Sequence, residues 1–321
     1  MVHGLYTIML VIVSDNTVDQ INGVATTYRE MSKHATVPIK FIHSNDFYNV
    51  PAPGYKDIRL ALPLNISSTL KCANKIHIAT EGPVGLAAML WCRKNKKSYT
   101  TAYHTKFPEA LVKWKIPLWL SRAYLKEFHS HASATLVTSA TMQNELQWLN
   151  ANTVVWSRGV NTEIFNTKNE PREPSNAMLY VGRVSDEKNI ESFLKLSGHK
   201  IVVGDGPARA KYEKMYSDVV WKGWLTGKEL AREYRNADVL VFTSTWDTFG
   251  LVMLESIACG TPVAGYNVTG PKDIVVNGVT GILTENDLQD AVKSAKNLGR
   301  VSGNFDWKNC WEIFERTVYK L

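Results

Sequence analysis

Short apolar runs alternate with helical stretches along the whole chain. The apolar runs are only a few residues long and rich in Val and Ile, a pattern typical of strands buried on both faces of a sheet. Helices are expected between them at Val84–Lys94, Pro108–Phe128, Leu230–Arg235 and Leu251–Ala258. The apolar runs predict strands at Ile8–Val13, Ile39–Ile42, Ile76–Ala79, Ser98–Ala102 and Ala134–Thr138, then at Ala177–Val181, Lys200–Val203, Val219–Trp221, Val239–Thr243 and Pro262–Gly265.

This alternation of strands and helices is typical of parallel sheets that helices cover on both faces. A polar, proline-containing stretch at residues 161–176 separates two such runs and predicts a linker. We therefore expect an α/β protein with one parallel-sheet domain over residues 1–160 and a second over residues 161–305. Because ligands of open parallel sheets bind beyond the carboxyl ends of the strands, two facing sheets predict a cleft between the domains.

The composition is that of an ordinary soluble protein, with 45% hydrophobic and 21% charged residues in a chain of 321. The apolar runs are shorter than the ~18 residues that a membrane span needs. The apolar start at Tyr6–Val13 predicts a buried first strand rather than a signal peptide, since no small-residue cleavage site follows it. The four cysteines lack metal-ligand spacing, which favours a reduced, cytoplasmic setting.

The excess positive charge is confined to the first half of the chain. Residues 1–160 hold 17 Lys and Arg against 9 Asp and Glu, a net charge of +8. The remaining residues hold 20 against 21, a net charge of −1. The asymmetry is either a solubility feature or the mark of an anionic partner of the first half.

The segment from Ser244 to Val263 carries the most informative chemistry. Asp247 is followed eight positions later by Glu255, and the turn after Asp247 opens an apolar helix. Free backbone N–H groups at a helix start attract an anion, and two nearby acids can bind hydroxyl groups. The alternative is a helix cap at Asp247 or Thr248 with a solvated Glu255, which leaves unexplained an acid on an otherwise apolar helix. A site for both phosphate and polyol is what a nucleotide sugar needs.

Three other strand-to-helix junctions add candidate residues. Arg183 and Lys188 follow a strand closely and together can neutralise a diphosphate, the alternative being surface charge. Gly23, in the loop after the first strand, allows backbone to approach a ligand closely. His104 ends a strand and is well placed for a cleft, although such a histidine taken alone is more often bonded to loop backbone. The stretch 202–207 is a dinucleotide fingerprint without its third glycine, so an NAD site is the least favoured alternative.

Seven ordered stretches resemble the retaining family-4 glycosyltransferases of the GT-B fold, in particular the bacterial mannosyl- and glucosyltransferases that use nucleotide sugars. The resemblance runs from about Ile8 to Phe314. It implies two Rossmann-like domains that face an interdomain cleft, with a C-terminal helix at 306–321 that packs back on the first domain. The stretches are Ile21–Val24, Thr80–Gly85, His104–Phe107, Ser157–Asn161, Tyr180–Asn189, Val203–Pro207, and Asp247–Leu251 with Glu255.

The resemblance also implies a role for each matching residue. Gly23 lets backbone approach the donor diphosphate, and Arg183 and Lys188 hold that diphosphate. His104 lies beside the transferred sugar, and Glu255 binds the ribose hydroxyls. Asp247 and the backbone of the following turn hold the donor sugar and its phosphate, and a loop after a strand lies along the nucleotide base. The turn residues are Thr248, Phe249, Gly250 and Leu251, and the base-binding residues are Trp224 and Leu225.

Two positions depart from the family pattern. Asp247 stands where the family usually has Glu, and Asp19 stands where it often has Pro before the Asn-Gly turn. The sequence contains no Asp-x-Asp pair, so we expect two cations and a helix start to hold the diphosphate, with no metal ion and no cofactor. In this family the acceptor attacks from the leaving-group face with the phosphate as its base. The resemblance therefore implies transfer of a hexosyl or pentosyl group with retained configuration.

The basic first domain is the one that shapes the acceptor site in this family, and two acceptor classes fit it. One is a membrane lipid, lipid-linked sugar or glycan. The stretch Lys113–Phe128 mixes cations with aromatic residues as interfacial segments do, unless it is a core-packing helix. The other is a hydroxylated base in viral or phage DNA, which the basic runs at 93–97 and 113–115 suit.

We favour the lipid or glycan acceptor and a cytoplasmic protein that docks at most peripherally on a membrane. A catalytically silent module that binds a nucleotide sugar is the remaining alternative. The choice between UDP- and GDP-linked donors stays open, because similar residue types bind both.

Overall fold

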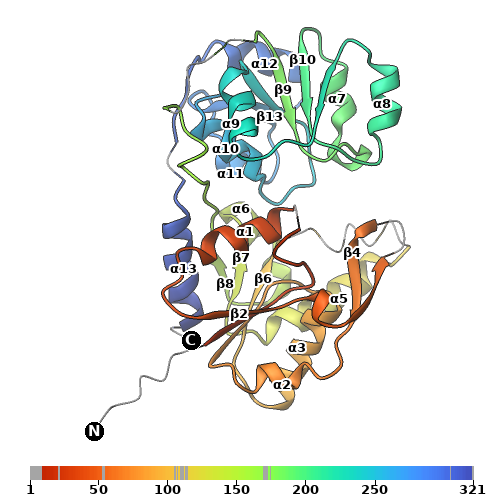
Figure 1. Ribbon diagram of the computed structural model, residues 1–321, viewed down its shortest axis with the longest axis vertical. Helices are drawn as coiled ribbons and strands as arrows, with labels where there is room; N and C mark the ends of the chain where they lie inside the picture. Colours follow the sequence, from red (N-terminus) through yellow and green to blue (C-terminus); the bar gives the residue numbers. More distant parts are fainter. Residues whose placement is uncertain are drawn as a thin grey trace. The chain divides into compact units, whose positions relative to one another are not determined.

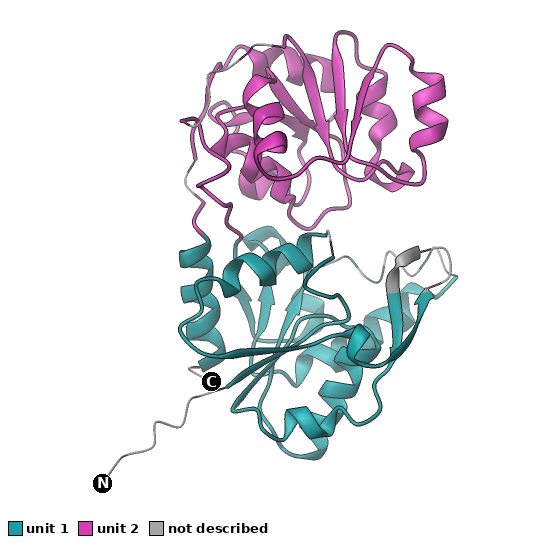
Figure 2. Ribbon diagram, in the orientation of Figure 1, with its two compact units in different colours: residues 1–157, 307–321 teal, residues 158–306 magenta. Residues whose placement is uncertain are grey.

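The computed structural model of the protein describes residues 9–20, 22–52, 55–104, 106, 108, 112, 115–168, 173, 175–303 and 305–319, with side chains for all of these except 52 and 55–58. The chain forms two compact units (Figure 2). Unit 1 comprises residues 1–157 and 307–321, and unit 2 comprises residues 158–306. Each unit has its own parallel sheet and its own buried core.

Unit 1 is built on a six-stranded parallel sheet in the order β2-β1-β5-β6-β7-β8 (Figure 1). All four residues of β1 are buried, as expected of a strand covered on both faces. Alternate residues of β5 point to opposite faces, where they meet helices from different parts of the chain. The strands are β1 (Leu10–Val13), β2 (Ile39–Ile42), β5 (Lys75–Ile78), β6 (Thr100–Tyr103), β7 (Thr135–Val137) and β8 (Thr153–Val155); the helices are α1 (Gly23–Ser32), α2 (Ser67–Leu70), α3 (Pro83–Lys94), α5 (Leu118–Ser130), α6 (Ala140–Glu145) and α13 (Trp307–Tyr319).

A separate two-stranded antiparallel hairpin projects beside this sheet (Figure 1). It consists of β3 (Tyr48–Ala52) and β4 (Tyr55–Leu62), and β4 contacts α3. Its register places Tyr48 opposite Leu62 and Val50 opposite Leu60. These four apolar side chains share one face of the ribbon, and all four are exposed.

The C-terminal helix α13 belongs to unit 1, far in sequence from the rest of it (Figure 2). Trp311 and Phe314 of this helix are almost completely buried, and α13 contacts both α1 and β5. The indole nitrogen of Trp156 donates a hydrogen bond of 3.0 Å to the carbonyl of Cys310, which anchors the helix at the end of the first segment.

Unit 2 is a six-stranded parallel sheet in the order β11-β10-β9-β12-β13-β14, the order of a doubly wound Rossmann-like domain. The strand order reverses between β9 and β12, which pair directly. The strands are β9 (Met178–Val181), β10 (Lys200–Val203), β11 (Val220–Gly223), β12 (Val239–Phe242), β13 (Val263–Tyr266) and β14 (Gly281–Thr284); the helices are α7 (Ile190–Leu194), α8 (Arg209–Met215), α9 (Gly227–Asn236), α10 (Leu251–Ala258), α11 (Pro271–Ile274) and α12 (Leu288–Lys296).

The ten strands predicted from apolar runs all correspond to strands of the two sheets, and the predicted α/β class with two Rossmann-like parallel sheets is confirmed. The sequence reading missed β3, β4, β8 and β14. These are the hairpin and one edge strand of each sheet, β8 and β14, whereas the opposite edge strands, β2 and β11, were predicted. A hairpin or edge strand is less completely buried than a central strand, so its apolar run is a weaker signal. The first strand begins at Leu10 in the described chain, and Ile8 lies outside the described residues.

One predicted helix is wrong in its extent. The helix expected at Pro108–Phe128 is interrupted: Pro108 and Val112 are helical, but the chain has left the helix at Lys115, and α5 begins at Leu118. Lys115 adopts a left-handed backbone conformation with a φ of +61°, and Pro117 occupies the N-cap, so a continuous helix cannot pass through this point. Part of the segment before Lys115, including Lys113, lies outside the described residues.

Candidate functional site

The point where the strand order of unit 2 reverses brings two loops together. β9 and β12 are parallel neighbours, so their carboxyl ends lie at the same edge of the sheet. The loop that carries Arg183 follows β9, and the loop that carries Asp247 follows β12. In open α/β sheets this position is where ligands bind, because loops on its two sides diverge and leave a crevice.

Lys188 and Asp247 form an ion pair across this point, 59 residues apart in the sequence. Both side chains are half-buried, with 29% and 26% of their surface exposed. The Thr243 hydroxyl donates a hydrogen bond of 2.9 Å to the Lys188 carbonyl, which joins the two loops a second time. Asn189 follows in the left-handed conformation and ends the turn of Asp186–Lys188. The structure thus brings together Lys188 and Asp247, two residues that the sequence had singled out separately.

Arg183 lies in the loop after β9, which glycines of the next loop hold in place. The side chain of Arg183 is half-buried, and its carbonyl accepts a hydrogen bond of 2.9 Å from the Tyr180 hydroxyl. A Cβ atom on Gly204 would lie 1.9 Å from the carbonyl oxygen of Gly182, and one on Gly206 would lie 2.3 Å from that of Val184. No larger residue fits at either position. The glycine-rich stretch 202–207 thus serves the close packing of the Arg183 loop.

The turn after Asp247 is shaped by glycines and leads directly into α10. Gly250 is the N-cap of α10 and has a φ of +110°, and a Cβ there would lie 2.7 Å from Met253 Cε. Thr248 and Phe249 are buried, so this turn presents backbone rather than these two side chains. The N-cap is therefore neither Asp247 nor Thr248, the two caps considered as the non-functional alternative. Leu251 begins the helix, where free N–H groups favour an anion.

Glu255 projects from α10 toward α9. The hydroxyl of Tyr234, a fully buried residue of α9, donates a hydrogen bond of 2.9 Å to Glu255 Oε2. Burial raises the pKa of Glu255 to about 7, although the hydrogen bond from Tyr234 works in the opposite direction. Burial also raises the pKa of Tyr234, so the hydroxyl stays protonated and remains the donor. Glu255 is thus no freely solvated acid. Tyr234 carries no local sequence signal of this role, because the pairing is tertiary.

Trp224 and Leu225 follow β11 at the same edge of the sheet. Trp224 is 45% exposed, whereas Leu225 packs partly against the core of unit 2. An exposed indole beside a half-buried leucine offers a flat apolar surface, which suits a stacked base.

The two predicted residues of unit 1 also lie just beyond strand ends. Gly23 is the first residue of α1, and the Asn22 side chain caps that helix with a hydrogen bond of 2.9 Å from the Ala25 N–H. A Cβ on Gly23 would meet no atom of the protein within 4 Å, so packing inside the protein does not require glycine there. His104 follows β6 and is half-buried, with its Nε2 atom 3.0 Å from the Tyr28 hydroxyl. His104 is therefore bonded to a side chain, and not simply to loop backbone.

Asp15, in the loop after β1, has a structural role. Its carboxylate accepts hydrogen bonds of 2.8 Å from the Val84 N–H and 2.7 Å from the Thr80 hydroxyl. It thereby satisfies free N–H groups at the start of α3. Burial raises the pKa of Asp15, and these hydrogen bonds oppose that shift.

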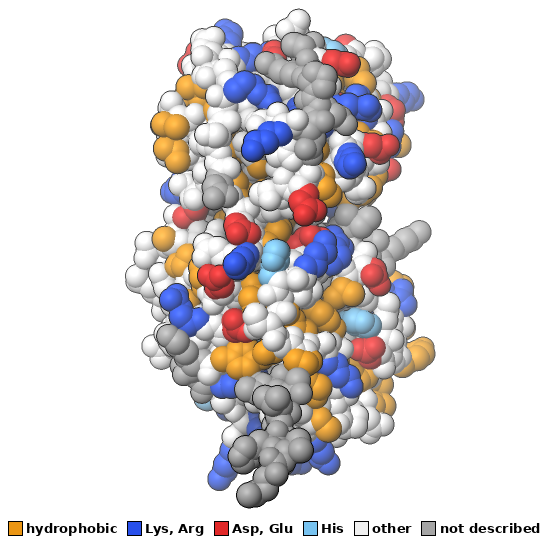
Figure 3. All heavy atoms as spheres, turned by 60° about the vertical axis from the view of Figure 1, so that its left-hand side comes forward, with side chains coloured by type: hydrophobic (Ala, Val, Ile, Leu, Met, Phe, Trp, Pro, Cys, Tyr) orange, Lys and Arg blue, Asp and Glu red, His pale blue; other side chains and the backbone are white. Residues whose placement is uncertain are grey.

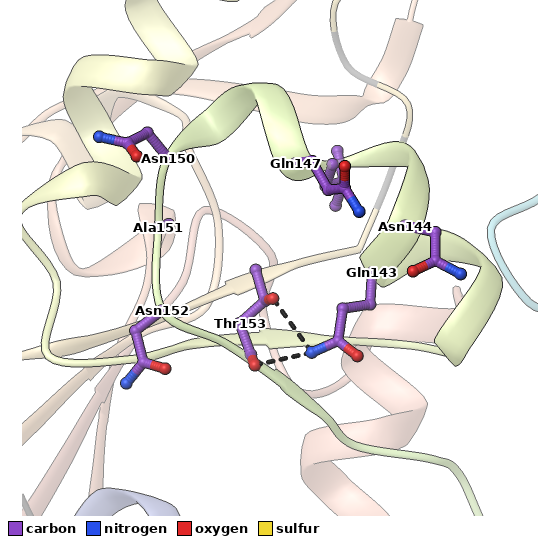
Figure 4. A pocket seen from close by; sticks show the side chains of 8 residues that line it. Gln143, Asn144, Gln147, Asn150, Ala151, Asn152 and Thr153 are labelled. Atoms are coloured by element: carbon purple, nitrogen blue, oxygen red, sulfur yellow. Dashed lines mark hydrogen bonds between the residues drawn. The ribbon is translucent and has the colours of Figure 1, made fainter.

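A surface hollow of about 570 Å³ lies elsewhere on unit 1, between α6 and the amino end of β8 (Figure 4). Amide side chains line it, and the Gln143 amide donates to the carbonyl and hydroxyl of Thr153 across its floor. None of the predicted residues lines this hollow. It lies at the amino end of its strand, the edge opposite to the one that carries the candidate residues.

The structure therefore brings the candidate residues together in two groups. One group surrounds the strand-order reversal of unit 2 and contains Arg183, Lys188, Asp247, the turn at 248–251 and Glu255, with Trp224 and Leu225 on the same edge. The other group contains Gly23 and His104 at the carboxyl edge of the sheet in unit 1. Each group lies where its own parallel sheet places ligands.

Comparison with known proteins identifies both units. The family described as Glycosyltransferase Family 4 matches residues 22–164, and the family described as Glycosyl transferases group 1 matches residues 161–298. The chain is therefore of the glycosyltransferase class. It belongs to the group 1 and family 4 glycosyltransferases and has their GT-B fold class of two Rossmann-like domains.

Three similar proteins illustrate the range of the class. The chain is 29% identical over 309 residues to the sulfoquinovosyl transferase SQD2 of Arabidopsis thaliana, covering 84% of this chain and 59% of that protein. It is 24% identical over 339 residues to the alpha-monoglucosyldiacylglycerol synthase of Streptococcus pneumoniae, covering 88% and 77%. The fold resembles that of Anabaena Alr3699/HepE in complex with UDP, with a TM-score of 0.70 and 16% identity, covering 98% of this chain and all of that one. The chain spans about three fifths of the length of the plant relative.

Proposed function

We propose that the protein transfers a sugar from a nucleotide-diphosphate sugar to a hydroxyl acceptor, with retained configuration and without a metal ion. The observation that carries this proposal is the junction of Lys188 and Asp247 at the strand-order reversal of unit 2, next to the start of α10. One side chain there suits a phosphate and the other suits a sugar hydroxyl. UDP in the complex of the Anabaena protein makes a uridine donor the first to test.

The chemistry follows from where charge develops. Cleavage of the bond between sugar and diphosphate leaves negative charge on the diphosphate and positive character on the sugar ring. Lys188, Arg183 and the N–H groups at 248–251 would stabilise the departing diphosphate, and one fixed donor of this kind is worth ~3 kcal/mol. Two cations that perform this task leave no step that requires a divalent ion.

The remaining groups would orient the donor. Asp247 would accept hydrogen bonds from the sugar, and Glu255 would accept them from the ribose hydroxyls. Trp224 and Leu225 would lie along the base. Because Gly23 has no side chain, the backbone there would approach the diphosphate closely. His104 would lie beside the transferred sugar. The acceptor would attack from the leaving-group face, with its proton passing to the departing phosphate, so that the anomeric configuration is retained.

Product analysis tests the reaction directly. The protein is incubated with a panel of UDP- and GDP-linked sugars, with and without EDTA, and donor cleavage is followed in the absence of added acceptor. We expect slow hydrolysis of one donor class, unchanged by EDTA, and NMR of the fresh product should show the configuration of the donor. An inverted product contradicts retention, and binding without any cleavage would favour the non-catalytic module.

For the acceptor, we propose a lipid or lipid-linked glycan at an anionic membrane surface. Tyr48 and Leu62 lie opposite each other on the hairpin and are 78% and 55% exposed, and Trp119 near the start of α5 is 71% exposed. Exposed aromatic and aliphatic side chains on a part of the chain with a net charge of +8 suit an anionic lipid surface. The diacylglycerol in the name of the pneumococcal relative is in keeping with a lipid acceptor.

Two further features bear on this acceptor. No helix in the described ranges has both the length and the apolar content needed to cross a bilayer. On the face drawn in Figure 3, basic and acidic side chains are interspersed, and no continuous basic stripe of the kind that binds DNA is visible there. Flotation with vesicles containing anionic lipid should carry the protein upward. Binding to duplex DNA with a steep salt dependence, and no flotation, would instead favour a DNA-base acceptor.

A further inference from the structure

Three side chains from separate elements meet inside unit 1. The hydroxyl of Tyr28, on α1, lies 2.7 Å from Nε2 of His77, on β5, and 3.0 Å from Nε2 of His104, which follows β6. The two histidines are 49 and 76 residues from the tyrosine in sequence. Both distances are those of hydrogen bonds, so one hydroxyl joins a buried imidazole to the half-buried imidazole of the candidate site.

The cluster is deeply buried and closely packed. Tyr28 is 2% exposed and His77 is fully buried. Nδ1 of His77 lies 2.8 Å from the Thr100 hydroxyl on β6, so the chain of hydrogen bonds runs from Thr100 through His77 and Tyr28 to His104. The rings of Phe314 and Trp156 pack against it. Phe314 lies edge-on to His77, with ring centroids 4.8 Å apart, and the ring centroids of Trp156 and His104 are 6.0 Å apart.

The single hydroxyl hydrogen of Tyr28 couples the protonation of the two imidazoles. A tyrosine hydroxyl has one hydrogen, so it can donate to only one of the two Nε2 atoms at a time. If it donates to His104, then Nε2 of His77 must carry its own hydrogen and donate to the tyrosine oxygen. If it donates to His77, Nε2 of His104 is the protonated one. In each arrangement the tautomer of His104 is set by that of His77. The Thr100 hydroxyl can donate to Nδ1 of His77 or accept from it, so it fits either arrangement.

We propose that Tyr28 is a positioning residue for His104, which fixes both the ring plane and the tautomer of that imidazole through His77. This inference rests on the proposed function, in which His104 lies beside the transferred sugar. A half-buried imidazole without such a contact can rotate and exchange tautomers, and displacement of a site group by about 1 Å can cost ~100-fold in rate. The C-terminal helix α13 takes part through Phe314, so a segment remote in sequence helps to hold the site.

Tyr28→Phe tests the proposal, because it removes the hydroxyl and keeps the ring that packs against Trp156. We expect kcat for donor cleavage to fall by about 10- to 100-fold, with KM for the donor changed by less than about twofold. NMR of protein with isotope-labelled histidine should show a single tautomer of His104 in the native protein and a mixture of both in the variant. The His104→Gln protein identifies the His104 signals.

Tyr99→Phe is the matched control in the same unit. Tyr99 is 4% exposed, and its hydroxyl makes no hydrogen bond within the described residues, so this change removes a buried hydroxyl without breaking the cluster. We expect kcat and the His104 signals of this variant to match those of the native protein. The melting temperature of both variants shows whether a loss of activity merely follows a loss of fold.

The outcomes separate the two proposals. Unchanged His104 signals in Tyr28→Phe overturn the positioning role, and so does a rise in KM that accounts for the whole loss of activity. If the native protein cleaves no nucleotide sugar at all, the proposed function fails. The NMR comparison still decides in that case whether Tyr28 sets the tautomer of His104.

Discussion

At the residue scale, the candidate site is defined by pairs of side chains rather than by single residues. Lys188 is joined to Asp247, Glu255 to Tyr234, and His104 to Tyr28. Both members of the first pair were singled out from the sequence. In the other two pairs only Glu255 and His104 were, whereas Tyr234 and Tyr28 were not. A half-buried charge that keeps a partner in the absence of ligand is already held in a fixed geometry, which is the condition for electrostatic stabilisation of a leaving group.

Replacement of Lys188 by Met is expected to lower kcat/KM for the donor by about 100-fold or more, since the variant loses a fixed cation at the departing diphosphate. Steady-state kinetics of donor cleavage measure this. Lys195→Met is the control, because Lys195 is 66% exposed and pairs with Glu191, four residues earlier, on the surface of unit 2. Equal activity of the two variants would show that Lys188 does not hold the diphosphate.

Glu255→Gln is expected to change the pH dependence of stability. Burial raises the pKa of Glu255 from 4.5 to about 7, so between these values the folded protein keeps a proton that the unfolded chain has lost. The native protein should therefore lose stability relative to the variant as pH rises from about 4.5 to 7, and the difference should level off above that range. Urea unfolding of both proteins at a series of pH values measures it. A constant difference across the range would show that the carboxyl group has an ordinary pKa.

Donor binding should reverse this trend, because ribose hydroxyls donate best to the ionised carboxylate. Calorimetric titration with UDP is expected to show tighter binding at pH 8 than at pH 6.5 in the native protein, beyond any change seen with Glu255→Gln. The variant serves as the control for titration of the nucleotide itself. The same pH dependence in both proteins would exclude Glu255 from the ribose site.

At the element scale, loops after parallel strands carry the chemistry and glycines allow those loops to pack. Gly204 and Gly206 lie against the backbone of the Arg183 loop, and Gly250 turns the chain into α10. Gly270 acts in the same way, since a Cβ there would lie 2.6 Å from the Phe249 carbonyl oxygen. The site loops are therefore held partly by close backbone contacts.

The C-terminal helix α13 is expected to carry much of the stability of unit 1. Phe314 is fully buried among Tyr28, His77 and Trp156, so Phe314→Ala should lower the free energy of unfolding by about 3–5 kcal/mol. Glu312→Ala, on the exposed side of the same helix, should change it by less than about 0.5 kcal/mol. Urea unfolding followed by tryptophan fluorescence measures both. Similar small effects would mean that α13 is only loosely attached to unit 1.

At the scale of the whole molecule, charge and exposed apolar surface are distributed unequally along the chain. The net charge of +8 belongs to residues 1–160, and the hairpin with its four exposed apolar side chains belongs to the same part. In the proposed function, this part also binds the acceptor. A surface that combines cations with apolar side chains binds anionic membranes through both attractions at once.

Vesicle binding should therefore depend on the hairpin. The double variant Tyr48→Ser with Leu62→Ser is expected to weaken flotation with anionic vesicles by roughly tenfold or more, because two insertable side chains are lost. Val276→Ser with Val279→Ser is the control on unit 2, where both side chains are similarly exposed, at 58% and 63%. Higher salt should weaken the binding of all three proteins. If the control pair weakens flotation as much as the hairpin pair, the hairpin is not the lipid contact.

The sequence alone determined the fold class and most of its elements. Buried parallel strands leave continuous apolar runs, and turns leave glycines, so both are visible locally. The same reading missed the hairpin and one edge strand of each sheet, and it joined the helical residues before Lys115 to α5 in one helix, because half-exposed strands and a left-handed residue at Lys115 leave weak local signals. The chemistry at Arg183, Lys188, Asp247 and Glu255 was visible as well, since charged residues beside apolar strands stand out.

Only the tertiary structure decided which of these residues meet. Lys188 and Asp247 are 59 residues apart and come together because parallel crossover connections return β12 to the side of β9. Tyr28 reaches His77 and His104 because α1 packs over neighbouring strands of unit 1, and Phe314 joins them because α13 returns to that unit after the whole of unit 2. A pairing of this kind is a property of strand order and packing. No window of sequence around either partner contains it.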